Sequence, residues 1–359
     1  MFIEFHAIQN FAPSNLNRDD TNNPKDCVFG NVRRARISSQ CLKRSIRFEP
    51  SFAEETKVPA AQRTKLILPE IRAELISLGL SEEEASTKAS EFVKEYCGKL
   101  DPKNQDKTAV LLFTCQQEIK EIAEGITSEE DIKRFVNTYA KKNSGRTSAP
   151  DVALYGRMLA DRPEANVDAA CQVAHAISTH AVNMDMDFFT AIDDLQPDAE
   201  SGAGMMGVVG FNSACFYRYA CVDFDQLVRN LSEDRELAEK TLRAFLHASV
   251  NAIPSGKQNS FAANNPPSFL MTVVRENAPC VSLANAFEMP VRPKARESLT
   301  AKSIEAMCDY YQRMESFFGT TAMATVVNLE PAAKLDTLNA KTASTLEEWI
   351  DTTIAEIRA

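Results

Sequence analysis

Residues 32–47 read Val32-Arg33-Arg34-Ala35-Arg36-Ile37-Ser38-Ser39-Gln40-Cys41-Leu42-Lys43-Arg44-Ser45-Ile46-Arg47, a stretch with six arginines or lysines and no carboxylate. The whole chain has 359 residues and a formal net charge of -10. A cationic segment in an acidic protein indicates a local site for an anionic partner, because the overall field of the protein does not attract polyanions. The sequence therefore predicts a polyanion-binding site around this stretch.

The second half of the stretch has the pattern of an amphipathic helix. Ser38 or Ser39 can cap its first N–H groups, and no Gly or Pro interrupts residues 40–48. At 100° per residue, polar and basic side chains share one face: Gln40, Lys43, Arg44 and Arg47. Leu42 and Ile46 fall on the opposite face and can dock on a core. The N–H groups and positive dipole end at the helix start suit a phosphate.

A solvated helix face is the alternative reading, and it is the usual one for a run of charges. Two features favour polyanion binding instead. The charges all have one sign, and three further arginines precede the helix at positions 33, 34 and 36.

The composition is that of an ordinary globular protein, with 44% hydrophobic and 25% charged residues. No apolar run reaches transmembrane length, and the N-terminus has neither the basic region nor the cleavage site of a signal peptide. The nine cysteines are dispersed without Cys-x-x-Cys spacing, which is typical of reduced thiols. We therefore expect a cytoplasmic protein without a membrane partner.

The spacing of apolar residues predicts an α+β fold. Strand-like segments are residues 2–8, 35–38, 152–158, 188–192, 214–222, 269–274, 281–287 and 324–329, and residues 167–179 also favour a strand. Helical patterns cover residues 40–48, 65–80, 81–96, 127–141, 232–252 and 303–318, and Ser344 is expected to cap a terminal helix. Residues 11–25 are predicted to form a loop, since they are rich in Asn, Asp, Pro and Ser.

A protruding hairpin is predicted in the second half of the chain. Its two strands would be residues 188–192 and 214–222, joined by a long flexible tip. The tip, residues 193–212, is first acidic and then rich in glycine, and it contains Met205 and Met206.

Several motifs together resemble one known family. Four N-terminal segments are similar to the signature of the type I-E CRISPR Cascade backbone subunit, the CasC family: Leu16-Asn17-Arg18-Asp19-Asp20, Lys25-Asp26, Phe29-Gly30 and Arg34-x-Arg36-Ile37-Ser38-Ser39-Gln40-x-Leu42-Lys43-Arg44. Residues 174–180, 187–195, 216–220 and 282–288 continue the resemblance in the same order. The likeness therefore extends over most of the chain.

The resemblance implies a fold and a function. The fold would be a modified RNA-recognition-motif palm, ferredoxin-like, made of residues 1–49 and 151–359. A helical finger insertion would occupy residues 50–150, and a thumb β-hairpin residues 184–214. Copies of the chain would polymerise along the crRNA guide beside other Cascade subunits, leaving guide bases free to pair with target DNA in antiviral defence. The chain would be no enzyme and would need no cofactor or metal.

By the same resemblance, guide phosphates would be held by Lys25, Ser38, Gln40, Lys43, Arg44 and Arg47. Arg18 is a further candidate for RNA binding. Met158 would lie near the bases, and Met205 and Met206 are candidates for the thumb. Lys257 lies in a Gly-containing turn and is a further candidate for a backbone contact. The chemistry agrees, because Lys, Arg, Ser and Gln contact phosphates without reading sequence, and Met can wedge into a base stack.

Two other functions remain open at this level. Asp19 or Asp20 could serve a metal-dependent RNA endonuclease, because related type III backbone subunits cleave target RNA with an Asp in the loop before their own Ser-Ser-x-Leu-Lys helix. These carboxylates can equally pair with Arg18 or order the loop, which we favour. His175 and His180 could bind a metal, but their i, i+5 spacing suits neither one helix face nor one strand face, so we expect structural roles.

Overall fold

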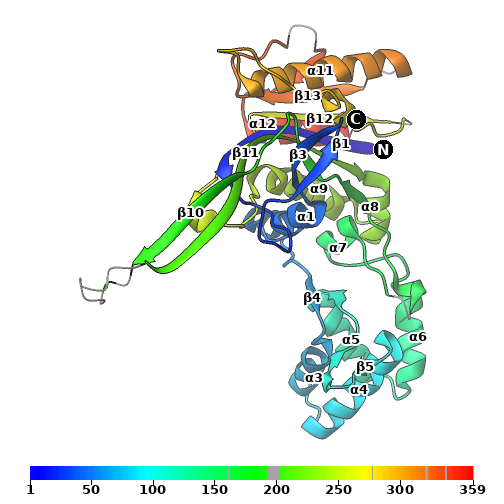
Figure 1. Cartoon of the computed structure of the whole chain (residues 1–359). Coiled ribbons are helices and arrows are strands. Elements are labelled where there is room, and N and C mark those ends of the chain that lie inside the picture. The colour runs from blue at the N-terminus through cyan, green and yellow to red at the C-terminus, as the bar shows by residue number, and fades with distance from the viewer. Residues whose placement is uncertain are drawn as a thin grey trace. The chain divides into compact units, whose positions relative to one another are not determined.

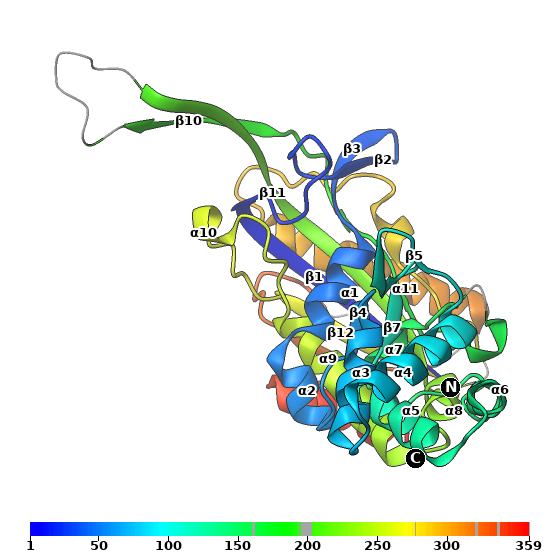
Figure 2. The ribbon, with the colours of Figure 1, turned by 90° about the horizontal axis from the view of Figure 1, so that it is seen from below.

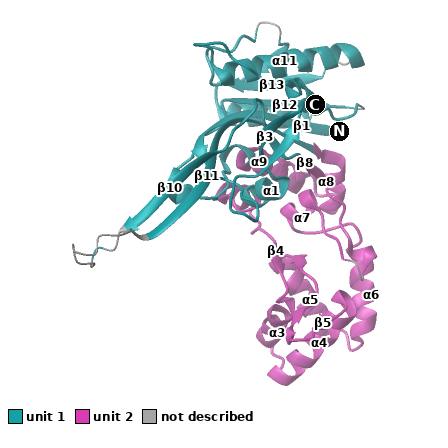
Figure 3. Cartoon of the chain, in the orientation of Figure 1, with its two compact units in different colours: residues 1–46, 173–221, 249–359 teal, residues 47–172, 222–248 magenta. Residues whose placement is uncertain are grey.

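The computed structural model describes residues 1–159, 162–192, 194, 203–276, 278–319, 322–335 and 338–358. The chain divides into two compact units (Figure 3). Unit 1 contains residues 1–46, 173–221 and 249–359, and unit 2 contains residues 47–172 and 222–248. Helices and a large, mostly antiparallel sheet are both present, so the predicted α+β class is confirmed.

The largest sheet among the described residues has ten strands (Figure 1). Eight follow the order β14-β13-β12-β1-β11-β9-β3-β2, while β8 and β10 also pair with β11. The bounds are β1 Phe2–Ser14, β2 Asp26–Phe29, β3 Val32–Ile37, β8 Cys171–Val173, β9 Ala176–Ser178, β10 Asp185–Ile192, β11 Ala203–Asp223, β12 Phe269–Arg275, β13 Met323–Asn328 and β14 Ala340–Thr342. In the antiparallel pair β1–β12, Phe2 lies opposite Arg275 and Ile8 opposite Phe269.

Residues 3–9 of strand β1 are buried on both faces because a helix covers each side. Ile8 belongs to a core cluster with Ile304 and Met307 of α11 (Leu299–Phe318). Phe5 points to the other face and packs edge-on against Trp349 of α12 (Leu346–Glu356), with ring centroids 6.2 Å apart.

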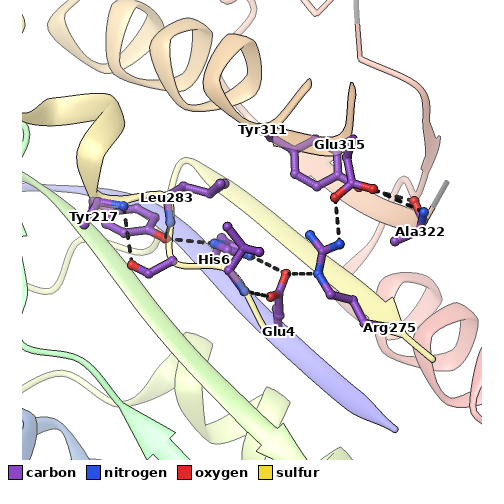
Figure 4. Close-up of polar contacts among 11 residues, drawn as sticks. Glu4, His6, Tyr217, Arg275, Leu283, Tyr311, Glu315 and Ala322 are labelled. Atoms are coloured by element: carbon purple, nitrogen blue, oxygen red, sulfur yellow. Dashed lines mark hydrogen bonds and ion pairs between the residues drawn. The ribbon is translucent and has the colours of Figure 1, made fainter. Parts of the chain in front are cut away.

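A buried polar network lies beneath α11 and includes two side chains of β1 (Figure 4). The Glu4 carboxylate forms an ion pair with Arg275 at 3.0 Å, and Arg275 forms another with Glu315 at 2.7 Å. His6 Nε2 lies 3.4 Å from Glu4, and its Nδ1 lies 2.9 Å from the Tyr217 hydroxyl. Pairing makes these buried charges tolerable, since an isolated one is costly.

Unit 2 is mainly helical, and its described residues include four short strands of its own besides the first two residues of β8 and the last two of β11. Its helices are α2 Pro50–Thr56, α3 Ile67–Ser77, α4 Glu82–Cys97, α5 Gln116–Ser128, α6 Ile132–Lys142, α7 Pro150–Tyr155, η1 Pro163–Ala165 and α8 Phe224–Asn230, with most of α9 Arg235–Asn251. The strands are β4 Gln62–Thr64, β5 Leu100–Asp101, β6 Asn104–Thr108 and β7 Leu112–Thr114. Where the structure is described, no helix is both long and apolar enough to cross a membrane.

Two predicted strands are wrong. Residues 152–158 fall mostly in helix α7, which begins with Pro150 at its first turn and ends at Gly156. This helix is buried all round, and its short apolar run at residues 152–155 does not distinguish helix from strand. Residues 281–287 form a loop that ends in the turn η3 (Ala284–Phe287). There the Leu283 N–H donates to the Tyr217 hydroxyl at 2.9 Å rather than to a neighbouring strand.

Several element boundaries also differ from the prediction. Strand β1 continues to Ser14 and takes the first residues of the predicted loop. Helix α6 begins after Asp131, because residues 127 and 128 end helix α5. Helix α9 begins at Arg235, since Ser232 has a φ of 59° that no helix accepts. Thr345, not Ser344, caps α12.

A hairpin is present as predicted, but its second strand is not the predicted one (Figure 2). Residues 185–192 of β10 pair with residues 203–211 of β11, whereas residues 214–222 lie farther along β11, where Phe216 and Tyr217 pair with β9. Residues 203–212 belong to β11 instead of a flexible tip, and Phe188 lies opposite Val208. Glycine suits this strand at position 207, because a Cβ there would come within 2.4 Å of the Phe189 ring. Residues 193 and 195–202 of the predicted tip lie outside the described residues.

Candidate nucleic-acid interface

The loop before β2 is tied to the start of helix α1 (Ser39–Arg47) through Asn17. The Asn17 Oδ1 accepts the Ser38 N–H at 2.8 Å, and its backbone carbonyl accepts the Lys25 N–H at 2.8 Å. The Lys25 carbonyl in turn accepts the Arg36 N–H at 2.9 Å. Two sequence motifs, joined at residues that are twenty-one positions apart, are thus held together as one piece.

Helix α1 docks as the sequence predicts. The Ser38 Oγ accepts the Cys41 N–H at 3.3 Å and caps the helix. Leu42 and Ile46 are 4% and 2% exposed, and Leu42 belongs to the core cluster that also contains Leu16. The buried face fixes the orientation of the opposite, polar face.

The polar face and the loop form one basic surface, which we define by Lys25, Arg36, Gln40, Lys43 and Arg44. Gln40 and Arg44 are exposed, and the other three are partly exposed. The Cys41 thiol senses two of these cations. Burial raises the pKa of the thiol, while Arg44 and Lys25 lower it. Lys25 and Arg44 therefore both act on Cys41, in the first turn of α1.

Arg36 connects this surface to the segment before β9. Its Nε donates to the Asp26 carbonyl at 3.0 Å, and its Nη1 lies 3.1 Å from His175 Nδ1. Burial, then Arg36, then Lys25 lower the pKa of His175. His175 is exposed at this edge, whereas sequence reasoning treated it as structural. The pairing of β3 with β9 is what brings it there, and no local motif signals that pairing.

A small concavity borders the basic surface within unit 1. It is lined by Asn17, Pro24, Lys25, Arg36, Asn212 and Phe216 among others. Polar and cationic groups thus line part of a recess beside the helix start, and apolar side chains such as Leu16 and Ile37 line the rest.

Arg47 does not share this surface, which corrects the helical-wheel prediction. It is 4% exposed, and its Nε donates to the Asp151 carboxylate at 2.7 Å. Its guanidinium lies over the Phe113 ring, 4.4 Å from the centroid. A buried, paired guanidinium is occupied in holding unit 2 together, so we exclude Arg47 from the site.

Lys257 and Arg18 lie at the loop next to the basic surface. The turn before Lys257 packs closely on the loop, since a Cβ on Gly256 would come within 2.3 Å of the Leu16 carbonyl oxygen. Lys257 itself has a left-handed φ of 52°. The exposed Arg18 donates from Nη1 to Asn22 Oδ1 at 2.8 Å and so helps to shape the loop.

The three predicted methionines are all highly exposed. Met158 is 82% exposed and belongs to unit 2. Met205 and Met206 are 56% and 67% exposed and lie on β11, opposite Ala191 and Thr190 of β10. As neighbours in a strand, they point to opposite faces of the hairpin, so they cannot share one contact. Phe188 and Val208 share the face of Met206.

The two candidate carboxylates have different surroundings. Asp19 Oδ1 accepts three hydrogen bonds, from Thr21 N–H at 2.9 Å, Thr21 Oγ1 at 2.8 Å and Asn23 N–H at 2.9 Å. The Thr21 hydroxyl and the Asn23 amide lower the pKa of Asp19. Asp19 therefore orders the loop, as favoured from sequence, while Asp20 is exposed. Across the described ranges, no three His, Cys, Asp or Glu side chains gather as metal ligands do.

Comparisons with known proteins agree with this picture. The family model described as CT1975-like protein matches residues 3–352. A chain in a solved "CRISPR RNA-guided surveillance complex, pre-nicking" is 30% identical, with a TM-score of 0.85 over 99% of this chain and 100% of that chain. A chain in a "CRISPR RNA-guided surveillance complex" is 27% identical, with a TM-score of 0.65 over 99% and 100%. No curated protein matches.

The family match covers nearly the whole sequence, and the structural likeness extends over both units. The predicted resemblance to a subunit of a Cascade-type CRISPR complex is confirmed at this level. The chain belongs to the CT1975-like protein family.

Proposed function

We propose that the chain is the non-catalytic crRNA-binding backbone subunit of a type I-E Cascade surveillance complex. Several copies polymerise along the guide RNA with other Cascade subunits, hold its phosphates and present its bases to target DNA in antiviral defence. One observation carries this proposal: the bond between Asn17 and Ser38 sets the cations of the loop beside those of helix α1.

The chemistry of the surface supports phosphate binding without base selection. A subunit that presents any guide sequence must contact the backbone, because base-edge contacts would select particular guides. Lys25, Lys43 and Arg44 supply charge, and Gln40 supplies a neutral donor at a helix start. The Ser38 N–H is bonded to Asn17, so Ser38 contributes through its hydroxyl alone.

In this proposal, the parts of the two units correspond to a palm, a finger and a thumb. The sheet of unit 1 acts as the RNA-recognition-type palm, the helical part of unit 2 as the finger, and the β10–β11 hairpin as the thumb. Arg18 and Lys257 contact the backbone beside the main surface. Met158, Met205 and Met206 contact bases through their exposed thioether side chains, which tolerate any sequence.

The test is a double substitution on the basic surface. Lys43→Ala with Arg44→Ala should leave the fold intact and weaken binding of single-stranded RNA, because two cations leave the surface. Binding is measured against salt concentration. Each lost phosphate contact should reduce the slope of log affinity against log salt by about 0.7.

The control is a double substitution of equal charge on unit 2, Lys94→Ala with Lys103→Ala, where both side chains are exposed. It should leave affinity and slope unchanged. If the two double variants behave alike, the basic surface is not the RNA site.

The proposal assigns no catalytic step to this chain. Complementary RNA incubated with the RNA-bound protein and Mg²⁺ should stay intact. Cleavage that depends on the metal and disappears in Asp20→Ala would establish the endonuclease alternative in its place.

A further inference from the structure

His175 lies at the edge of the basic surface and directly precedes β9. Strand β9 pairs with β3 so that Ile177 lies opposite Arg36. This register brings Arg36 Nη1 to 3.1 Å from His175 Nδ1 and leaves the histidine exposed. The ring thus occupies a defined place on the surface that we propose to bind RNA.

The contact with Arg36 fixes the tautomer of the ring. A guanidinium has only N–H donors, so His175 Nδ1 must accept with its lone pair. The proton of the neutral ring then lies on Nε2, at the other edge of the imidazole. Within the described residues, no group accepts a hydrogen bond from this Nε2.

The charged groups that face the ring are cations. Arg36 extends from β3, and Lys25 lies in the segment before β2. The nearest carboxylate of β2, that of Asp26, pairs with Arg33 at 3.1 Å instead. Burial and these two cations lower the pKa of His175, so the ring is neutral in the free protein at neutral pH.

We propose that His175 is a further RNA-binding residue, and that its Nε2–H donates to a phosphate oxygen of the ribose-phosphate backbone lying on the basic surface. This inference rests on the RNA-binding function proposed above. A phosphate brings negative charge to a ring that otherwise faces cations, and so favours the imidazolium form.

Proton uptake changes the partner of Arg36. A proton taken from solvent by Nδ1 occupies the lone pair that accepted Arg36 Nη1–H. The guanidinium loses that bond, and Nη1 becomes available to the phosphate. Binding of the backbone, protonation of His175 and release of Arg36 are therefore linked.

The sign of the pH dependence follows. The pKa of His175 is higher in the RNA complex than in the free protein. Protonation of His175 therefore increases the affinity for RNA at low pH, and this increase is lost as the pH rises through the pKa of His175 in the complex. Each pKa unit by which the complex exceeds the free protein increases the affinity at low pH by up to about ten-fold.

The experiment measures binding of the full chain to a single-stranded oligouridylate between about pH 5.5 and about pH 8, at one salt concentration. Uracil does not titrate in this range, so the RNA contributes no pH dependence. The wild-type affinity should rise about three- to ten-fold toward the acid end. His175→Gln keeps a neutral N–H donor, so it should bind like the wild type at pH 8 and lose most of this rise.

His247→Gln is the matched control, because His247 lies on α9 in unit 2, and it should keep the full rise. Calorimetry of the wild type near pH 6, in two buffers of different ionisation enthalpy, should also show net proton uptake on binding. If the wild type binds RNA without proton uptake, or if His175→Gln keeps the wild-type rise, this inference fails and the RNA-binding function stands. If the folded wild type binds no RNA at any pH, both fail.

Discussion

The Ser38 amide donates to the side chain of Asn17 at 2.8 Å, across a gap of twenty-one residues in sequence. This bond satisfies an N–H at the start of helix α1 and at the same time fixes the loop that carries Lys25. One side-chain carbonyl therefore supports both the local fold and the basic surface.

Asn17→Ala should cost about 1 kcal/mol in the free energy of unfolding, because the Ser38 N–H loses its partner. RNA binding should weaken as well, since the loop that carries Lys25 loses its side-chain bond to the helix start, although the backbone bonds of Lys25 remain. Denaturant unfolding and RNA titration measure the two effects. Asn17→Asp keeps the acceptor and so the stability, but its charge beside Lys25 should still weaken binding. An Asn17→Ala protein with wild-type RNA affinity would show that the loop does not contribute to the site.

Periodicity in the sequence predicted helix α1 and its buried face, because Leu42 and Ile46 determine how it docks. It could not predict that Arg47 is buried in an ion pair, because its partner Asp151 is distant in the chain. Arg34 is a similar case: it is fully buried and donates to the carbonyl oxygens of Ser178 and Phe287. Charge alone does not distinguish a binding cation from one that holds segments together.

The rest of the candidate site was predictable only in part, for the same reason. Lys25 lies in the loop motif, and Gln40 and Arg44 lie in the helix motif, so the sequence motifs predicted all three. His175 joins them through the β3–β9 register, which depends on strand pairing rather than on any local pattern. Helix α7 was missed because an element buried on all sides has no amphipathic period.

Arg47→Ala should destabilise the protein by about 3–5 kcal/mol, because it leaves the Asp151 carboxylate buried without its cation. Arg44→Ala, three positions earlier, should change stability by about 0.5 kcal/mol or less, since its side chain is exposed. Urea unfolding of the two variants compares them directly. Equal losses of stability would mean that the buried ion pair is not what distinguishes these arginines.

Tyr217→Phe tests the polar network under α11. The hydroxyl accepts the Leu283 N–H at 2.9 Å and contacts His6 Nδ1 at 2.9 Å, so its removal leaves two buried groups unsatisfied. A loss of about 1–3 kcal/mol is expected in denaturant unfolding. Tyr310→Phe removes a hydroxyl from a partly exposed ring and should be nearly neutral. A neutral Tyr217→Phe would indicate that other groups satisfy His6 and Leu283.

Gly256→Ala should disturb the loop from the opposite side. Its new Cβ would lie 2.3 Å from the Leu16 carbonyl oxygen and 2.8 Å from that of Asn15, so backbone must move. We expect a loss of about 1–3 kcal/mol together with weaker RNA binding. Gly79→Ala adds a methyl group where nothing lies within 4 Å, at a strained φ of +97°. This control should lose some stability but no RNA affinity. Retained RNA affinity in Gly256→Ala would separate Lys257 and its turn from the site.

The hairpin offers a test in which two adjacent residues should behave differently. Met206 shares its face with Phe188 and Val208, which are 62% and 60% exposed, whereas Met205 points to the other face. A contiguous exposed apolar face is the kind of surface that contacts a partner.

Met206→Ser should therefore reduce RNA-dependent assembly, and Met205→Ser should reduce it less. Both side chains are exposed, so the free energy of unfolding should change by about 0.5 kcal/mol or less in either variant. Light scattering of the protein with guide RNA gives the mass of the assembly, and urea unfolding checks stability. A larger loss of assembly for Met205→Ser would assign the contact to the opposite face of the hairpin, since strand geometry allows each methionine only one side.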